Sequence, residues 1–413
     1  MKVAFICTLY APNHIGGAEK AVRMLAETLV ARGHEAVVIS LSPDREFSER
    51  VIEGVKVYYV PLANIYWPQA PADQRPPWRA ALWHLIDAYN PIMGARVRKI
   101  LAAEKPDVVE SNNLLGFSVA AWRAAKTLGI PVVQVLHDYY LGCPNSAMIK
   151  GERNCNVQCG VCSVYATPRR LLSDIPKVVS SVSRRTLQRV EQTGMFARVP
   201  RKTVVPSAFD FDGEPPPRAD KAPGSPLTLG YLGRLESIKG IELLLQAVHR
   251  VPVDKITLLL AGNGAPEFVT DLQQRYRRSN IHFLGFTEPA AFFSRIDALV
   301  VPSVWEEPLS RVVFEGYTFG VPPLVARIGG MPEIVEDGVT GYVFEPNDAA
   351  ALAKLFEDLV EQGLPAERLY AACRKKSSGF SIDDVFRAHM ANWQHAIAAQ
   401  AADVEPANQM EIS

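Results

Sequence analysis

Two glutamates, Glu307 and Glu315, are the residues of this chain best suited to chemistry on a polar ligand. Glu315 is the only acid in the helical segment VVFEGYTFG, and a carboxylate in apolar surroundings needs a partner or a polar ligand to offset its desolvation. Glu307 lies in a loop after the apolar strand expected at 298–301, at the strand end where open α/β sheets bind ligands. We therefore predict that the two acids face one cleft, which binds a ligand with hydroxyl groups. Alternatively, Glu307 caps a turn and Glu315 meets a neighbouring arginine.

A helix is expected to begin between these two acids. Ser310 is a suitable N-cap for a helix that starts at Arg311 and ends before Gly320. A helix N-terminus offers unpaired N–H groups and a positive dipole end, which suit a phosphate. A ligand with hydroxyls at both ends and phosphate in the middle, such as a nucleotide sugar, would fit, and Leu309, Ser310 and Arg311 are expected to border it.

Two cations follow another expected strand, at 227–232. Arg234 and Lys239 lie in the glycine-bracketed segment GRLESIKG, where they could clamp a diphosphate and stabilise it as it leaves. The alternative is that both charges are simply solvated. Gly264 and Phe286 follow two later strands, where backbone groups could border a nucleobase.

The N-terminal half contributes further candidates. Gly16 and Gly17 precede a helix expected at 18–32 and allow the backbone to approach an anionic ligand, although an ordinary turn would need the same glycines. The dinucleotide fingerprint G-x-G-x-x-G is absent there, which argues against NAD or FAD. His137 follows the strand expected at 131–136, where it could hydrogen-bond a sugar hydroxyl or merely cap the strand.

Four of the six cysteines lie close together in one polar loop: Cys143, Cys155, Cys159 and Cys162. The spacing C-x3-C-x2-C is close to that of zinc or iron–sulfur ligands, so we predict a structural metal that orders the loop. A disulfide pair and free thiols are the alternatives. Four protein ligands would leave no open coordination position, so the metal would not be catalytic.

The remaining sequence indicates an α/β protein of two domains. A chain of 413 residues exceeds the size of one hydrophobic core, and strands alternate with helices in both halves. We expect a Rossmann-like domain at 1–206, a proline-rich linker at 207–225, a second Rossmann-like domain at 226–380 and a disordered tail at 400–413. Zero net charge argues against nucleic acid as the main partner, and without a signal peptide or an apolar run long enough to span a bilayer we expect a cytoplasmic protein.

The chain resembles the family 4 glycosyltransferases of GT-B fold, in which two Rossmann-like domains face each other across a cleft. The resemblance spans nearly the whole chain and is strongest from Leu227 to Phe344. It is carried by GRLESIKG, LAGNG, FLGF, VPSVWEEPLSRVVFEGYTFGVPPLVA, GGMPEIVEDGVTGYVF, GGAEKAV and RGHEAVVIS. It implies a helix at about 381–399 that crosses back onto the first domain.

The resemblance also implies a reaction: retaining transfer of a sugar from a UDP- or GDP-sugar to a glycan or lipid-linked acceptor, without a catalytic metal, in cell-surface polysaccharide or glycoconjugate synthesis. A lipid-linked acceptor would bring the enzyme to the inner face of the membrane. By resemblance, the E-x7-E element gives Glu307 to the transferred sugar and Glu315 to the nucleotide ribose, Arg234 and Lys239 hold the diphosphate, Gly16 and Gly17 approach it, and His137 lies by the sugar.

Two departures bear on specificity. Leu309-Ser310 stands where the family commonly has Phe-Gly, which leaves donor preference open, and Gly316 weakens the helix that follows. Three rivals to transfer remain at this point: a sugar-nucleotide epimerase, a phosphorylase of the same fold, and a binding module without activity.

Overall fold

The computed structural model describes residues 1–13, 16–70, 75–151, 153–209, 211, 213, 215 and 217–410, and side chains only as far as residue 403 in the last helix. The chain forms two compact units. Unit 1 comprises Met1–Met148, Cys155–Pro206 and Asp383–Ser413, and unit 2 comprises Ile149–Asn154 and Ser207–Ile382. The second segment of unit 1 ends at Pro206, the residue at which the sequence analysis ends the first domain. The expected linker groups with unit 2, and Lys221 in it forms a backbone bridge with Leu364.

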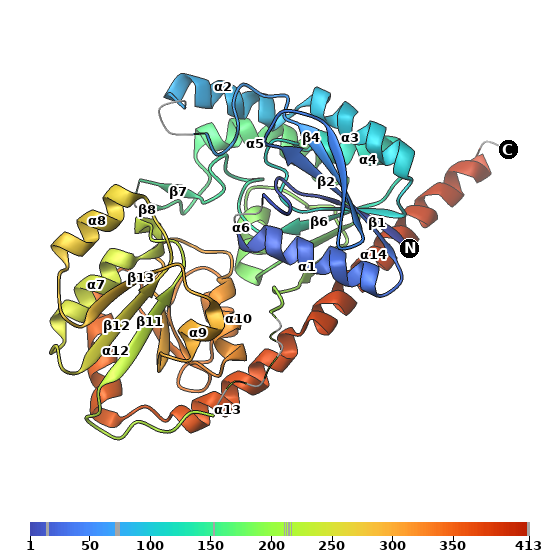
Figure 1. The fold of residues 1–413 in the computed structure, drawn as a ribbon. Coiled ribbons are helices and arrows are strands. Elements are labelled where there is room, and N and C mark those ends of the chain that lie inside the picture. Colours follow the sequence, from blue (N-terminus) through green and yellow to red (C-terminus); the bar gives the residue numbers. More distant parts are fainter. Residues whose placement is uncertain are drawn as a thin grey trace. The chain divides into compact units, whose positions relative to one another are not determined.

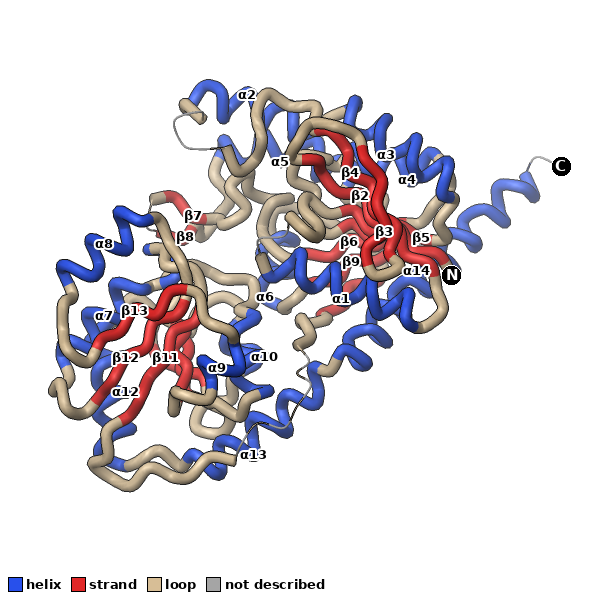
Figure 2. Tube along the Cα trace, viewed as in Figure 1, coloured by secondary structure: helices blue, strands red, loops and turns tan. Residues whose placement is uncertain are grey.

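Unit 1 is built on an eight-stranded sheet in the order β10-β9-β6-β5-β1-β2-β4-β3 (Figures 1 and 2). Neighbouring strands are parallel except the edge pair β3 and β4. The order turns back between β1 and β5, so the loops after these two strands diverge at a point where such sheets bind ligands. The strands are β1 (Lys2–Ile6), β2 (Glu35–Ser42), β3 (Ser48–Ile52), β4 (Val55–Pro61), β5 (Val108–Ser111), β6 (Val132–Leu136), β9 (Val178–Ser181) and β10 (Arg201–Val204).

The helices of unit 1 cover the sheet and close its core. Apolar residues of α1 (Gly17–Ala31) and of α14 (Ile382–Met410) share one buried cluster with β1 and β2. Trp393 on α14 is completely buried there and packs edge-on against Phe5. The other helices are α2 (Pro77–Ala88), α3 (Pro91–Glu104), α4 (Ala120–Thr127), α5 (Gly160–Leu172) and α6 (Arg184–Glu191).

The last helix, α14, differs from the expectation at its end. It belongs to unit 1 from Asp383 onward, in keeping with a helix that crosses back onto the first domain. It continues helically through residues 400–410, where the sequence analysis expects a disordered tail. The last part of that expected tail, 411–413, lies outside the described residues.

Unit 2 contains a six-stranded parallel sheet in the order β13-β12-β11-β14-β15-β16. The order reverses between β11 and β14, which defines the ligand-binding switch point of a doubly wound sheet. The strands are β11 (Leu227–Leu232), β12 (Ile256–Ala261), β13 (Ile281–Gly285), β14 (Ala298–Val301), β15 (Pro323–Ala326) and β16 (Tyr342–Phe344). The short hairpin of β7 (Ile149–Lys150) and β8 (Arg153–Asn154), which no sequence pattern predicts, also groups with unit 2.

Two buried clusters fill the faces of this second sheet. One packs α7 (Ile241–Arg250) and α12 (Ala349–Gln362) against the strands, and the other packs α9 (Pro289–Phe293) and α10 (Arg311–Thr318). The fold class predicted from the sequence is therefore correct. The remaining helices are η2 (Ser237–Lys239), α8 (Pro266–Arg275), α11 (Met331–Ile334), α13 (Ala366–Ser377) and η3 (Ser378–Phe380).

Candidate active site

Two loops of unit 2 meet at the switch point of its sheet. They follow β11 and β14, which are parallel neighbours, so both loops leave the same edge. The backbone N–H of Val304 donates to the carbonyl of Ile238 at 3.2 Å and joins the loops directly. Gly240 has a φ of 74°, and a Cβ there would lie 1.8 Å from the carbonyl oxygen of Pro302. Only glycine allows this approach.

The joined loops place Lys239 against Glu307. The Nζ atom of Lys239 donates to Oε1 of Glu307 at 2.5 Å, and the hydroxyl of Ser303 donates to Oε2 at 2.7 Å. Glu307 is 7% exposed, and the Lys239 ammonium lies 5.5 Å from the ring centre of Trp305. The structure thus brings together two residues predicted separately from the sequence. It also adds Ser303, which the sequence analysis did not single out.

The backbone of Glu307 is held from a third loop. Its carbonyl accepts from the N–H of Gly330 at 2.9 Å. Gly329 has a φ of 60°, and a Cβ on it would lie 2.1 Å from the same carbonyl oxygen. The Gly-Gly pair therefore permits a tight contact that fixes the position of the Glu307 backbone. It belongs to the quoted segment GGMPEI, to which the sequence analysis gave no role.

Arg234, the other predicted cation, is more exposed. Its guanidinium donates to Glu236 at 2.7 Å, with 61% of the arginine side chain exposed. Its carbonyl accepts from the hydroxyl of Tyr231 at 2.6 Å. Burial raises the pKa of the Tyr231 phenol. The negative charges of Glu307 and Glu236 raise this pKa further, and the positive charge of Arg234 lowers it, so all three charges lie near the phenol. Because surface ion pairs contribute little, Arg234 can exchange Glu236 for an anionic ligand at small cost.

The start of α10 only partly follows the prediction. Ser310 occupies the N-cap position, but its side chain makes no capping hydrogen bond, so the expected role of that hydroxyl is wrong. Arg311 donates from Nε to Glu315 at 3.2 Å, one helical turn away, and the Glu315 side chain is 13% exposed. The arginine pairing left open as an alternative for Glu315 is therefore present. The phenyl ring of Phe209 also lies beneath the Arg311 guanidinium.

The other predicted donor residues of unit 2 differ in their surroundings. Gly264 forms a parallel bridge with Leu235, and a Cβ on it would lie 2.4 Å from the Leu235 carbonyl oxygen. Its immediate role is thus close packing against the loop of Arg234. Phe286 is 74% exposed beyond β13, available to a flat ligand, whereas Leu309 packs partly buried against the apolar cluster around α10.

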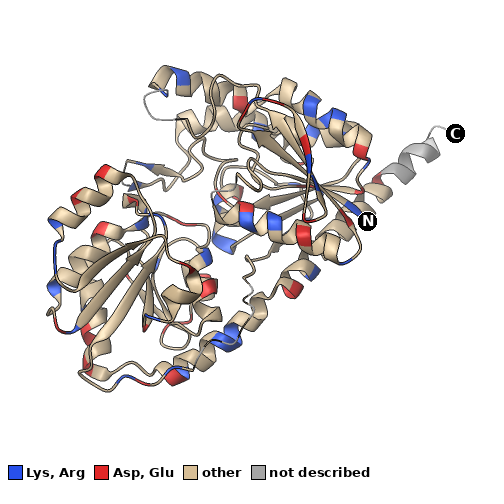
Figure 3. Cartoon of the chain, viewed as in Figure 1, with Lys and Arg blue, Asp and Glu red and all other residues tan. Residues whose placement is uncertain are grey.

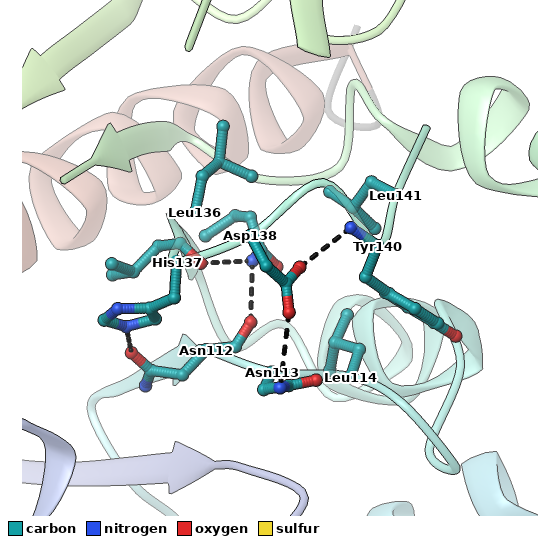
Figure 4. A pocket seen from close by; sticks show the side chains of 10 residues that line it. Asn112, Asn113, Leu114, Leu136, His137, Asp138, Tyr140 and Leu141 are labelled. Carbon is teal, nitrogen blue, oxygen red and sulfur yellow. Dashed lines mark hydrogen bonds between the residues drawn. The ribbon is translucent and has the colours of Figure 1, made fainter. Parts of the chain in front are cut away.

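Unit 1 has a polar pocket at the ends of β5 and β6, lined among others by Asn112, Asn113, Gln134, His137 and Asp138. Figure 4 shows the His137 ring turned toward Asn112, whose Oδ1 lies 2.8 Å from Nε2. Asn113 donates to Asp138 at 3.4 Å, and burial raises the pKa of Asp138 to about 6. The sequence analysis missed the two asparagines, although they directly follow the buried strand β5.

The glycines of unit 1 lie where the sequence places them. Gly16 is the N-cap of α1, and its backbone N–H donates to the side chain of Glu19 at 3.0 Å. Gly17 is the first residue of the helix, one position before the expected start. The residues immediately before Gly16 lie outside the described part of the chain.

Three of the four cysteines in the loop contact one another. The sulfur of Cys162 lies 3.9 Å from that of Cys143, and its backbone N–H donates to the Cys159 sulfur at 3.5 Å. All six cysteines lie in the described part of the chain, and none of them forms a disulfide. Across the described residues, no group of three or more His, Cys, Asp or Glu side chains is arranged to hold a metal ion. The structural metal therefore stays a prediction from the spacing of Cys143, Cys155, Cys159 and Cys162.

Comparison with known proteins assigns the family. Residues 16–208 match the glycosyl transferase 4-like domain, and residues 217–376 match the glycosyl transferases group 1. An uncharacterised protein of the cps region of Klebsiella pneumoniae is 31% identical over 334 residues, which cover 81% of this chain and 87% of that protein. The glycogen synthase of Mycobacterium tuberculosis is 27% identical over 430 residues, covering 100% of this chain and 98% of the relative.

A solved structure agrees on the fold. HepE of Anabaena, in complex with UDP, has a TM-score of 0.69 at 20% identity, covering 95% of this chain and 100% of HepE. A doubly wound sheet in each unit, with polar loops at each switch point, defines a protein of GT-B fold. The chain belongs to the family 4 glycosyltransferases and is a transferase of sugars.

Proposed function

We propose that the enzyme transfers a sugar, with retention of anomeric configuration, from a nucleoside diphosphate sugar to a hydroxyl of a glycan or a lipid-linked glycan in polysaccharide or glycoconjugate synthesis. The observation that carries this proposal is the pair of Lys239 and Glu307 at the switch point of unit 2. A relative from a cps region and a relative named glycogen synthase support a polysaccharide as the acceptor class.

The charges of this loop cluster fit a departing diphosphate. In the proposed reaction Lys239 and Arg234 meet the negative charge that grows on the leaving phosphates, and Glu307 orients a hydroxyl of the sugar. The acceptor hydroxyl attacks the anomeric carbon on the face that the diphosphate leaves, and a diphosphate oxygen takes its proton. Because the two cations supply the positive charge at the phosphates, we propose that no catalytic metal is required.

The base of the donor can be tested by thermal shift. UDP is proposed because HepE was solved with it, and GDP is the alternative. A ligand at about 100 times its Kd stabilises the native state by about 2.7 kcal/mol, and each kcal/mol raises the Tm of a large domain by about 2–4 °C. We expect UDP to raise the Tm by several degrees, with GDP and ADP giving smaller shifts.

The variant Arg234→Ala tests where the nucleotide binds. Its guanidinium is exposed and paired only at the surface, so the unliganded Tm should stay near that of the wild type while UDP affinity falls at least about tenfold. Arg327→Ala is the matched control, because Arg327 is also exposed and paired with a carboxylate in unit 2. An unchanged UDP shift in Arg234→Ala would remove Arg234 from the donor site.

A membrane surface is the second proposed partner. No helix in the described part of the chain is long and apolar enough to cross a bilayer. However, α2 exposes Trp78, Leu82 and Leu85 on one face, and the adjacent α5 exposes Val161 and Val164. Neither helix has an exposed acid, and in Figure 3 Lys and Arg positions are coloured blue along α3, the next helix of the chain. An apolar face beside basic groups suits an anionic lipid surface, which would present a lipid-linked acceptor.

Sedimentation with lipid vesicles tests this contact. The wild type should sediment with vesicles of phosphatidylcholine and phosphatidylglycerol more than with phosphatidylcholine alone. Trp78→Glu should lower the bound fraction several-fold without changing the Tm, because 69% of Trp78 is exposed. Val253→Glu places the same charge on an exposed apolar residue of unit 2 and should bind as the wild type does. If Trp78→Glu binds the vesicles as well as Val253→Glu does, the apolar face of α2 and α5 is not the membrane contact.

A further inference from the structure

A buried chain of hydrogen bonds in unit 1 leads from the last helix to His137. Glu110 on β5 is completely buried, and its Oε2 accepts from the indole N–H of Trp393 at 2.8 Å and lies 2.8 Å from Nδ1 of His389. Its other oxygen, Oε1, accepts from Nδ2 of Asn112 at 3.2 Å. The amide of Asn112 then reaches Nε2 of His137 through Oδ1. The mechanism proposed above uses none of these residues, and the sequence analysis singled out only His137.

We propose that Glu110, acting through Asn112, fixes the proton of His137 on Nε2, so that Nδ1 is a permanent hydrogen-bond acceptor for a hydroxyl of the sugar or of the acceptor. Glu110 and Asn112 are thereby positioning residues. The proposal rests on the proposed function in one respect only, namely that the ligand beside His137 bears hydroxyl groups.

The direction of each bond follows from the chemistry of its partners. An ionised carboxylate can only accept, so Asn112 must turn its NH2 group toward Glu110. Its carbonyl oxygen then faces His137 and can only accept, so Nε2 must carry the proton. A neutral imidazole has one donor and one acceptor, which leaves Nδ1 without a proton.

The surroundings favour the required protonation states. Burial opposes ionisation of Glu110, but the charge of His389 and the donors His389, Trp393 and Asn112 outweigh it and lower the pKa of the carboxyl. Burial lowers the pKa of His137 to about 4, against the opposing charge of Glu110. Near neutral pH His137 is therefore uncharged, and which nitrogen holds its proton decides what it can bind.

Nitrogen NMR on protein labelled with 15N-histidine tests the proposal directly at neutral pH. The chain has eight histidines, and the variant His137→Asn identifies the signal of His137 by its loss. The wild type should show a protonated Nε2 and an unprotonated Nδ1 at His137. A ring protonated on Nδ1, or a charged ring, would overturn the proposal, and this measurement needs no substrate.

The variant Glu110→Gln tests what sets the tautomer. If the glutamine oxygen keeps the bond to Trp393, its NH2 group faces Asn112, which must then turn over and present its own NH2 group to His137. The proton of His137 should move to Nδ1. His389→Asn is the matched control, because asparagine can still donate to Oε2 and leave the carboxylate in place. It should keep the wild-type tautomer.

Kinetics separate positioning from a merely structural role. Glu110→Gln should lower kcat at least about tenfold while the KM for the donor changes less than about threefold, because the lost acceptor lies in the other unit from the predicted donor site. An inverted tautomer with wild-type kcat would overturn the role of Nδ1 and leave the transferase assignment intact. If Glu110→Gln fails to fold, the tautomer of the wild type decides.

Discussion

Replacing Lys239 with alanine is expected to lower kcat for sugar transfer by about 10²–10³-fold, the usual cost of removing one group that stabilises charge in a transition state. Lys239 is held 2.5 Å from Glu307 and stacks near Trp305, so its position is set before the donor arrives. Lys239 contributes most in the transition state, when negative charge grows on the departing diphosphate. Therefore kcat should fall more than the KM for the donor rises.

The carboxylate partner gives the complementary test. Glu307→Gln keeps the shape of the side chain and the contact with Ser303, and we expect a loss of kcat similar to that of Lys239→Ala. Since the two residues act as one unit, the double variant should be little worse than either single variant. Initial rates with UDP-sugars and a glycan acceptor panel measure these effects.

The exposed ion pair of Arg327 with Glu345 supplies a control in the same unit. Arg327→Ala should leave kcat, KM and Tm unchanged, because such pairs contribute about 0–1 kcal/mol. Circular dichroism should show that Lys239→Ala and Glu307→Gln remain folded. Turnover at the wild-type rate in either variant would remove the pair from the catalytic site.

Local patterns were sufficient to predict most of the elements. The apolar run at 298–301 became β14, and the helix expected from Arg311 was found from Arg311 to Thr318 because hydrophobic spacing and a terminal glycine are both read locally. The sequence also predicts a helix over 180–192, and its start is wrong, because the helix α6 begins at Arg184. Ser180 and Ser181 belong to the strand β9, which lies between β10 and β6 in the sheet and is buried throughout, so two polar residues concealed a buried strand.

The candidate site was predictable residue by residue but not as contacts. Lys239 and Glu307 were chosen for their charge and their place after a strand, yet only the pairing of β11 with β14 brings them together. Glu110 carries no local signal, because its partners His389 and Trp393 lie on a helix 279 and 283 residues away in the chain. Register and long-range packing supply that information, and no spacing rule contains it.

Replacing Arg169 with methionine should destabilise unit 1 by about 3–5 kcal/mol, the cost of breaking a buried ion pair. Arg169 and Asp87 are both completely buried, and their charged groups lie 3.6 Å apart. The guanidinium also donates to the carbonyl of Tyr140 at 2.5 Å and lies 3.9 Å from the centre of its ring. Methionine fills similar space but leaves the carboxyl of Asp87 without its counter-charge.

The stability lost in Arg169→Met should depend on pH. Burial raises the pKa of Asp87 from 3.8 to about 7, and Arg169 opposes this rise. A carboxyl with a raised folded pKa contributes stability that is present below its unfolded pKa and disappears as pH rises through the folded value. Without Arg169 the folded pKa rises further, so this loss extends to higher pH. Arg169→Met should therefore cost more stability at a pH well above 7 than at a pH well below 7.

Urea unfolding at one pH on each side of 7 measures both effects. Arg98→Met is the control, since Arg98 is an exposed arginine on a helix of the same unit and its loss should change stability by less than about 0.5 kcal/mol at either pH. Equal stability of Arg169→Met and Arg98→Met would contradict a structural ion pair. A loss that is the same at both pH values would show that Asp87 does not titrate between them, and that packing against Tyr140, not charge, is what Arg169 contributes.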